Sequence, residues 1–365
     1  MSYIAAAHTA LPLHKYAQDE LIAAFRELWA KKYFNVDRIE QFHRNVMVGS
    51  RNLALPLERY KQLSGFGESN AAYIEAAMEI VERMAGEMLR ECQVDPSDIH
   101  LIISTSVTGI AVPSLDARLM NRIPFPPSTK RIPLFGLGCM GGASGISRAA
   151  DYLRGHPEEN ALFFSVELCS LTLQREDLSV ANIVSSGLFG DGAAAVLMLG
   201  KNSKLAGRVH PGLVLPGKPE IRMPRILDNR SCFFPNTERI MGWDMKDTGF
   251  QVVLDPGVPE FAKEHLRPGL EAFLKEHGLT IGDIDLWVAH PGGPKVISGM
   301  EEGLGLKPGT LRLSIESLQK YGNLSSASVL FILKETLAMN PPAGSLGVLV
   351  AMGPAFAAEY SLLQW

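Results

Sequence analysis

Long apolar runs alternate along the chain with segments in which apolar residues recur every three or four positions. Continuous apolar runs predict buried strands, and the 3.6-residue periodicity predicts amphipathic helices. Pro-rich segments at 124–127 and 211–224 are expected to form loops. The alternation of the two patterns predicts an α/β protein. We expect strands at 101–106, 161–166, 193–199, 285–289 and 347–352, and helices at 71–92, 142–153, 259–277 and 325–339.

Three short strings recur in the same order in the two halves of the sequence. DIHL at 98–101 returns as DIDL at 283–286, and CMGGAS at 139–144 returns as NLSSAS at 323–328. GDGAAA at 190–195 has a looser counterpart, GPAFAA, at 353–358. The repeats predict two similar α/β halves, residues 1–205 and 206–365. Cys139 and Asn323 would then occupy equivalent positions at two helix N-termini.

Composition narrows the class of protein. The chain has 365 residues, 46% hydrophobic and 20% charged, and a net charge of −4, so no global basic field indicates nucleic-acid binding. No apolar stretch is long enough to predict a membrane span, and the N-terminus does not resemble a secretory signal. The four cysteines lie too far apart for a metal motif or a small disulfide framework, which indicates a reducing cytoplasm; they are Cys92, Cys139, Cys169 and Cys232.

Cys139 follows an apolar run and a Gly-rich turn, Phe135 to Gly142, and precedes a helical pattern. A helix N-terminus or a neighbouring imidazolium can lower a thiol pKa to roughly 3.5–7.5. That setting favours an acylatable nucleophile. Taken alone, the same pattern also fits a buried cysteine in a tight turn.

Two further residues are candidates for the same site. His290 ends an apolar run and is followed by Pro-Gly-Gly, which resembles a site at the carboxyl edge of a sheet. Asn323 precedes a helical pattern at the position equivalent to Cys139. A histidine at a strand end is often a simple hydrogen-bonding residue, and an Asn before a helix is often its N-cap. The repeat is what links Asn323 to Cys139.

Together, four strings resemble the type III polyketide synthases, the chalcone synthase-like family of the thiolase superfamily. They are Gly-Cys139 with Gly-Gly, His290-Pro-Gly-Gly, Tyr-Gly-Asn323-x-Ser-Ser and Leu-Phe-Gly-Asp191-Gly. The resemblance implies a thiolase fold, with duplicated halves in αβαβα layers and mixed five-stranded sheets, and a homodimer. It implies Cys139, His290 and Asn323 as catalytic residues, acyl-CoA and malonyl-CoA as substrates, and neither a metal nor another cofactor.

The resemblance also assigns residues around the catalytic three. Phe189 and Phe250 match gatekeeper aromatics, Thr172 a cavity residue, and Val112 a residue that reaches the partner subunit's cavity. Arg44 matches a CoA-phosphate contact, which Arg51, seven residues on and predicted to share a helix face, would support. The remaining substrate-binding candidates are Met241, at a position that is small in plant enzymes, and Ser325.

The expected function is iterative decarboxylative condensation of malonyl-CoA onto a Cys139-bound starter. Similarity to bacterial alkylpyrone and alkylresorcinol synthases favours a long-chain fatty acyl-CoA starter. The family loop Gly-Phe-Gly-Pro-Gly departs here to Ala351-Met-Gly-Pro-Ala355, so the form of cyclisation stays open. Two alternatives also stay open: a ketoacyl synthase III-like enzyme that condenses once on a carrier protein, and a catalytically silent protein that binds CoA thioesters.

Overall fold

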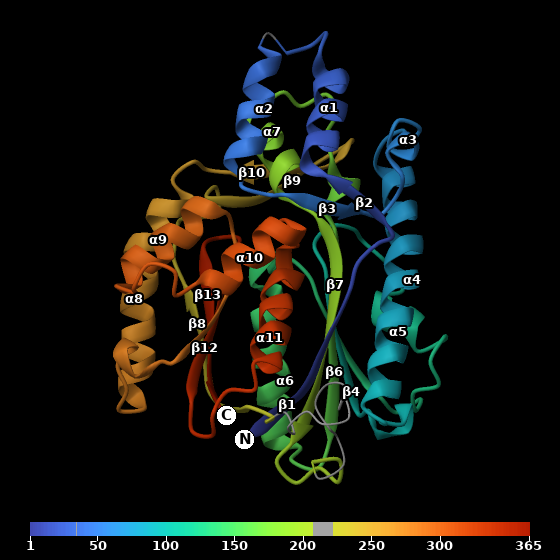
Figure 1. Ribbon diagram of the computed structural model, residues 1–365. Helices are drawn as coiled ribbons and strands as arrows, with labels where there is room; N and C mark the ends of the chain where they lie inside the picture. The colour runs from blue at the N-terminus through green and yellow to red at the C-terminus, as the bar shows by residue number, and fades with distance from the viewer. Residues whose placement is uncertain (34, 207–221) are drawn as a thin grey trace.

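In the computed structural model, which describes residues 1–33, 35–206 and 222–365, a single nine-stranded mixed sheet runs through the molecule. The strand order is β5-β4-β6-β7-β1-β8-β13-β12-β11 (Figure 1). The bounds are β1 (Ser2–Ala10), β4 (Leu101–Thr105), β5 (Lys130–Leu134), β6 (Asn160–Leu168), β7 (Asp191–Gly200), β8 (Arg225–Phe233), β11 (Leu286–Ala289), β12 (Leu346–Gly353) and β13 (Ala357–Gln364).

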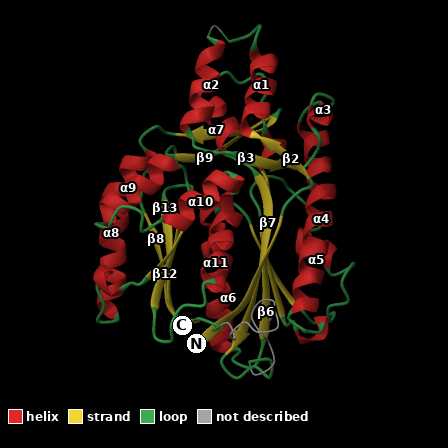
Figure 2. Cartoon of the chain, in the orientation of Figure 1, coloured by secondary structure: helices red, strands yellow, loops and turns green. Residues whose placement is uncertain are grey.

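The sheet folds around a central pair of helices, so that the molecule has five layers in the order α, β, α, β, α. Helices α6 (Gly141–Gly155) and α11 (Ser328–Ala338) pack between the two halves of the sheet (Figure 2). Helices α4 (Phe66–Glu91) and α5 (Leu115–Leu119) cover one outer face, and α8 (Val258–Glu276) and α9 (Pro294–Leu304) cover the other. The predicted α/β class and layer order are therefore confirmed.

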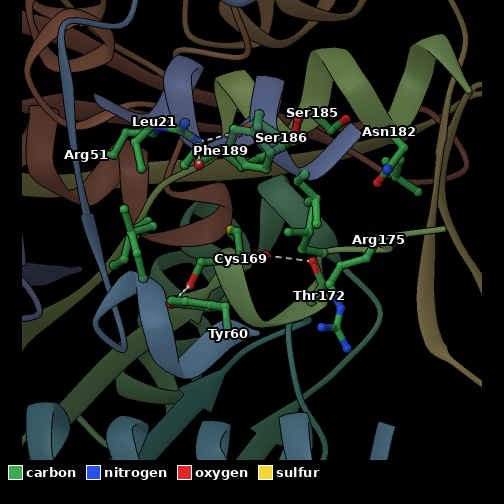
Figure 3. Close-up of a pocket in the computed structure, with 18 of the residues that line it drawn as sticks. Leu21, Arg51, Tyr60, Cys169, Thr172, Arg175, Asn182, Ser185, Ser186 and Phe189 are labelled. Carbon is green, nitrogen blue, oxygen red and sulfur yellow. Dashed lines mark hydrogen bonds between the residues drawn. The ribbon is translucent and has the colours of Figure 1, made fainter. Parts of the chain in front are cut away.

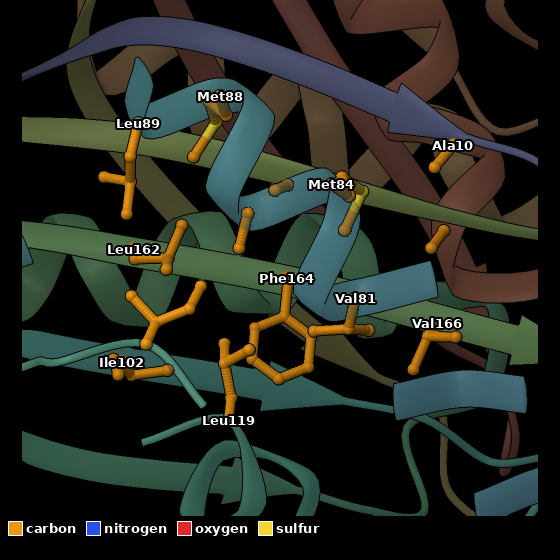
Figure 4. Close-up of a cluster of buried hydrophobic side chains, with 14 of the residues drawn as sticks. Ala10, Val81, Met84, Met88, Leu89, Ile102, Leu119, Leu162, Phe164 and Val166 are labelled. Atoms are coloured by element: carbon orange, nitrogen blue, oxygen red, sulfur yellow. The ribbon is translucent and has the colours of Figure 1, made fainter. Parts of the chain in front are cut away.

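Strand β6 shows why the predicted apolar runs are continuous rather than alternating. Leu162 and Phe164 pack under α4, as Figure 4 shows, whereas Ala161 and Phe163 face α6 and α11. All four side chains are completely buried. A strand buried on both faces needs apolar residues at nearly every position. Burying a large apolar side chain contributes about 1.5–3 kcal/mol, so each face adds to the stability of the sheet.

The two halves have matching element orders. In the first half, η1 (Pro96–Asp98) precedes β4, which pairs in parallel with β6; in the second, η4 (Ile281–Asp283) precedes β11, which pairs in parallel with β12. The antiparallel pairs β6–β7 and β12–β13 also match. We infer that the chain divides between β7 and β8, next to residues 207–221, which lie outside the described residues.

The expected five strands per half apply to the first half alone. Among the described residues the second half contributes four strands, because α10 (Arg312–Tyr321) replaces the strand that would correspond to β5. A strand there would pair beside β11, but the buried face of α10 packs against β11 and α11 instead.

Each half also carries an insertion between its first strand and its long helix. The first half inserts a cap of β2 (His14–Ala17), α1 (Gln18–Trp29), α2 (Val36–Asn45), β3 (Ser50–Leu53) and α3 (Leu57–Tyr60). The second half inserts the hairpin β9 (Met241–Lys246) and β10 (Gly249–Leu254). The cap packs on α7 (Val180–Leu188) through Trp29, Ile39 and Ile183, all fully buried. Figure 1 shows α1, α2 and α7 together at the top of the molecule.

Every strand and helix predicted from periodicity is present, with differences at the ends. The helix expected at 325–339 begins with the 3₁₀ turn η5 (Ser325–Ala327) before α11, and α4 begins five residues earlier than expected. The predicted loop at 124–127 is confirmed, whereas most of the loop at 211–224 lies outside the described residues. None of the helices in the described parts of the chain is long and apolar enough to cross a membrane.

Candidate active site

Cys139 lies in a 3₁₀ turn, η2 (Gly138–Met140), directly before α6, as the sequence predicted. Gly138 has a φ of 50°, and a Cβ there would lie 2.4 Å from the Cδ of Pro354. Both the left-handed backbone and the close approach require glycine at this position. The turn therefore packs on the end of β12 and presents Cys139 at the mouth of the helix.

The N-terminus of α6, from the first half, contacts the turn η5 before α11, from the second half, next to Cys139. A Cβ added at Gly142 would lie 2.1 Å from the carbonyl oxygen of Ser326, and one at Gly141 would lie 2.8 Å from Oγ1 of Thr105. Two glycines thus allow the N-terminus of α6 to touch η5, the turn that leads into α11. This contact brings the nucleophile candidate of the first half to the Asn323 turn of the second.

Asn323 is fixed by both its backbone and its side chain. Its N–H donates to Leu188 O, and its carbonyl oxygen accepts from the N–H of Gly190, each at 2.9 Å. Its Oδ1 accepts from the Ser325 N–H at 2.8 Å, and its Nδ2 donates to Gly292 O at 3.3 Å. The short bond to Oδ1 sets the orientation of the amide, while the longer bond leaves Nδ2 available to another acceptor.

Ser325 connects Asn323 to the thiol. The Sγ of Cys139 donates to the hydroxyl of Ser325 at 3.7 Å, and the Asn323 amide lies close enough to lower the pKa of the thiol. Ser325 is buried and has a φ of 48°, which turns the chain into η5. The predicted neighbours Cys139, Asn323 and Ser325 are therefore in direct contact.

His290 follows β11 and is 2% exposed. Its backbone N–H donates to Val350 O at 2.9 Å, which holds it beside the end of β12. Neither ring nitrogen has a hydrogen-bond partner in the described parts of the chain. Burial lowers the pKa of His290 to about 3, so the free site holds a neutral imidazole with two unused nitrogens.

The thiol of Cys139 is also neutral in the free site. Burial and the charge on Glu167 raise its pKa to about 12, although its hydrogen bond to Ser325 and the nearby Asn323 amide act to lower it. In the free site burial therefore acts against the lowering that a helix mouth can produce. His290 makes no hydrogen bond that would stabilise a thiolate.

Glu167, which the sequence analysis did not select, lies fully buried on β6 beneath the site. It accepts hydrogen bonds from the Ser326 hydroxyl, from the Val107 N–H at 3.1 Å and from Thr108 Oγ1 at 2.9 Å. Burial raises its pKa. These bonds hold η5 on the first half's sheet. A carboxylate inside the apolar run of residues 161–168 was the signal for it.

A pocket of roughly 980 Å³, open mouth included, lies beside these residues (Figure 3). Phe189 and Thr172 line it, as the resemblance implies, together with Cys169. Phe189 pairs through its backbone with Asn323, so the pocket begins next to the candidate catalytic residues. Cys139, His290 and Asn323 are not among its lining residues, although they were expected at the bottom of such a pocket.

Phe250 lies behind the pocket wall and does not line the pocket. Its ring packs against Phe66 at 5.4 Å and against Trp243 at 5.9 Å between centroids. Trp243 and Val252, opposite each other in the β9–β10 hairpin, form the wall instead. Neither residue was predicted from the sequence. Met241, on the same hairpin, packs on the outer core of the second half and also lies outside the pocket lining.

Val112 is 88% exposed on the surface and does not reach this chain's own pocket. Its exposure is compatible with the partner contact that the resemblance implies.

Arg44 and Arg51 do not share a helix face, so that prediction is wrong. Arg44 lies in α2, exposed and paired with Asp19 and Glu40, whereas Arg51 lies in β3 and is 3% exposed. Helix α2 ends at Asn45, and Met47 takes a φ of 59° before the strand begins. A buried Arg51 cannot serve the surface phosphate contact expected of it.

Comparisons with known proteins agree with this geometry. Residues 226–364 match the model of the chalcone and stilbene synthases, C-terminal domain, and residues 48–209 match that of the FAE1/type III polyketide synthase-like proteins. A 1,3,6,8-tetrahydroxynaphthalene synthase from Streptomyces peucetius is 44% identical over 99% of this chain and 93% of its own length. A putative chalcone synthase from Bacillus subtilis is 36% identical over 100% of this chain and 99% of its own.

A crystal structure of 1,3,6,8-tetrahydroxynaphthalene synthase from Streptomyces coelicolor superimposes with a TM-score of 0.89 at 31% identity, covering 100% of this chain and 99% of that one. This similarity confirms the predicted thiolase fold. The chain therefore belongs to the type III polyketide synthases and is an acyltransferase of that family.

Proposed function

We propose that Cys139 is the nucleophile that carries the growing chain, and that His290 and Asn323 form the decarboxylation site. The Cys139 sulfur attacks the acyl-CoA carbonyl, an acyl–sulfur bond forms, and the CoA thiol leaves. Because thiol and imidazole are both neutral in the free site, the thiol proton passes to His290 as the acyl-CoA binds. His290 then returns it to the departing CoA thiolate.

The second step uses the same two donors. Malonyl-CoA binds with its thioester oxygen toward Asn323 Nδ2 and the imidazole N–H of His290. Loss of carbon dioxide leaves an enolate whose charge these donors stabilise, and its carbon attacks the Cys139 thioester. The carbon–sulfur bond breaks, and a CoA ester two carbons longer results. A donor aimed at developing charge contributes roughly 3–4 kcal/mol.

The observation that carries this proposal is the availability of donors at one buried site. Both nitrogens of His290 lack partners within the described residues, and Asn323 is oriented through Oδ1 while Nδ2 holds one long bond. Buried polar groups without partners are rare in folded proteins and need an explanation. A thioester oxygen would satisfy both groups at once.

Two starter classes remain candidates, each with its own support. Apolar side chains of α1 in the pocket wall, Leu21, Ala24, Phe25 and Leu28, suit a long-chain fatty acyl-CoA and an alkylpyrone or alkylresorcinol product. The 44% identical relative is named for a naphthalene with hydroxyl groups at alternating ring positions, the pattern that head-to-tail malonyl units produce. The second class uses malonyl units throughout.

The test is incubation of the purified enzyme with malonyl-CoA, alone and with a panel of acyl-CoA starters, with no carrier protein present. We expect products longer than the starter by more than one two-carbon unit, detected by mass. A single condensation that needs a carrier protein would favour a ketoacyl synthase III-like enzyme. Binding of CoA thioesters with no turnover would favour a silent protein. Product from malonyl-CoA alone would select the second starter class.

The remaining expectations belong to the same proposal. The enzyme acts as a cytoplasmic homodimer without a metal or a redox cofactor, and exposed Val112, with Ile110 beside it, forms part of the partner contact. CoA phosphates bind near Arg44, which would exchange its pairs with Asp19 and Glu40 for phosphate oxygens. Nucleic acid is not a partner, in line with the net charge of −4.

A further inference from the structure

Arg51 is a cation enclosed at one side of the pocket. Its Nη1 donates to the carbonyl oxygens of Ser186 at 2.5 Å and Phe189 at 2.8 Å, and its Nε donates to Gln18 Oε1 at 3.2 Å. Its Nη2 is buried and has no hydrogen-bond partner among the described residues. The guanidinium group therefore uses Nη1 to bind the backbone at Ser186 and Phe189, while Nη2 makes no hydrogen bond.

Asp191, whose charge acts on Arg51, does not bond its Nη2. Asp191 accepts hydrogen bonds from the Ala54 N–H at 2.7 Å, from the Ser170 N–H at 2.8 Å and from the Ser170 hydroxyl. It exerts a charge effect on Arg51, but none of the ion pairs found in the described residues joins the two. A buried donor without a partner lowers the stability of the fold, and a charged donor lowers it more than a neutral one. We therefore expect a bound molecule to supply an acceptor for Nη2.

A second unused donor lines the same pocket. Ser185, on α7, is buried, and its hydroxyl has no partner in the described parts of the chain. Figure 3 shows Arg51, Phe189 and Ser185 along one side of the pocket, with Cys169 and Tyr60 across from them. Cys169 is close enough to Cys139 for a charge on that sulfur to raise the pKa of its thiol. The pocket thus reaches from Cys169, which lies close to Cys139, to two unused donors.

We infer that Arg51 and Ser185 form a subsite that binds the oxygen atoms of the growing poly-β-keto chain. This inference rests on the proposed function. A chain built from malonyl units carries an oxygen on every second carbon, and its 1,3-dicarbonyl groups ionise to enolates that a guanidinium binds much as it binds a carboxylate. An alkyl chain would leave both donors unsatisfied. The subsite therefore selects for extended, oxygenated intermediates and against early release.

The test compares Ser185→Ala and Arg51→Gln with the wild type in three measurements: acylation of Cys139, decarboxylation of malonyl-CoA, and the distribution of product lengths. Loss of the Ser185 hydrogen bond should lower the ratio of full-length to shortened product about 2- to 10-fold, and loss of the charged donor more than 10-fold. Acylation and decarboxylation should stay near wild-type rates in Ser185→Ala.

Ser317→Ala is the matched control, because Ser317 is a buried serine whose hydroxyl also lacks a partner in the described chain but which lies on α10, outside the pocket lining. It should keep the wild-type product distribution. If Arg51→Gln does not fold, Ser185→Ala decides alone.

Unchanged product lengths in Ser185→Ala would overturn the inference, and so would equal losses in all three measurements, which would show a purely structural role. If the wild type makes no polyketide at all, the proposed function itself fails. A wild type that makes polyketide while its variants keep its product lengths refutes only the subsite.

Discussion

The two halves of the molecule place different chemistry on the same local structure. In the first half, the turn η2 presents Cys139 before α6; in the second, the turn before η5 and α11 presents Asn323. A glycine with a positive φ precedes the reactive side chain in both halves, Gly138 at φ 50° and Gly322 at φ 76°, and in the second half Ser325 at φ 48° also follows it. A duplicated scaffold can thus supply a nucleophile from one copy and a hydrogen-bond donor from the other.

The insertions differ more than the repeated cores. A cap of three helices and two strands enters the first half, whereas a single hairpin enters the second at the corresponding point. Both line the same pocket, the cap through residues such as Leu21 and Tyr60 and the hairpin through Trp243 and Val252. The repeated cores position the reacting groups, and the unequal insertions shape the space for the chain.

The largest effect should follow removal of the thiol. Cys139→Ala should abolish acylation and lower polyketide formation to below about 10⁻³ of the wild-type rate, since a missing nucleophile removes the covalent route. Decarboxylation of malonyl-CoA should continue, because His290 and Asn323 remain. Parallel assays of product and of carbon dioxide release check both statements. Full-length polyketide from Cys139→Ala would contradict the proposal that Cys139 carries the chain while residues of the second half act in decarboxylation.

Removal of the amide donor is the complementary change. Asn323→Ala should slow decarboxylation about 10²- to 10³-fold, or roughly 3–4 kcal/mol, while acylation of Cys139 falls much less. Asn323→Asp retains an acceptor for the Ser325 N–H and loses the donor, so it should show the same selective loss. Equal losses of acylation and decarboxylation in both variants would show that Asn323 acts only through the structure.

Acid should act on the cap through His43. This histidine is fully buried, its Nε2 lies 2.9 Å from Ile183 O, and burial with the charge of Arg51 lowers its pKa to about 4. The unfolded chain therefore binds a proton between pH 6.5 and 4 that the folded chain excludes, and stability falls as the pH falls through that window. From pH 7 to 4.5 this group should remove about 2–3 kcal/mol.

Urea unfolding of wild type and His43→Gln at the two pH values measures this contribution. The variant should lose less free energy of unfolding on acidification than the wild type, whatever its stability at pH 7. Identical losses in the two proteins would show that His43 does not control the acid stability of the cap.

The crossing of the two helix starts predicts a smaller effect. A Cβ at Gly142 meets the Ser326 carbonyl at 2.1 Å, so Gly142→Ala should destabilise the fold by about 1–3 kcal/mol and lower activity as the turns separate. Gly155, at the other end of the same helix, has nothing within 4 Å of its Cβ position. Gly155→Ala should therefore be neutral or stabilising by up to about 1 kcal/mol. Similar unfolding free energies for the two variants would argue against the close crossing.

The core of the fold could be predicted from the sequence because its signals are local. Strands such as β6 and β12 are largely apolar and buried along almost their whole length, and helix α4 keeps its periodicity over 26 residues. The cap could not be predicted in the same way. Helices α1 and α2 are short and largely polar on their outer faces, and they are held by buried contacts from distant parts of the chain, such as Trp29 Nε1 donating to Arg175 O at 2.9 Å.

The residues of the candidate site also differ in whether a local sequence pattern could predict them. Cys139, His290 and Asn323 could be selected because each lies at the end of a strong local pattern and the repeat linked two of them. Arg51 was misassigned because helix periodicity was extended across Met47, where the chain turns into β3. Trp243 and Val252 line the pocket through contacts with other elements, and a single sequence holds no local signal for those contacts. Glu167 did carry a local signal, a carboxylate within an apolar run, but its partners lie in other elements.

Two cysteines are candidates for the residue that carries the acyl chain. Cys139 lies at the N-terminus of α6, whereas Cys169 lines the pocket. The most direct measurement is mass spectrometry of peptides from enzyme quenched after brief exposure to an acyl-CoA without malonyl-CoA. We predict the acyl group on the peptide that contains Cys139 and an unmodified Cys169. An acyl group on Cys169, or a modified Cys169 in the Cys139→Ala variant with polyketide synthesis retained, would contradict it.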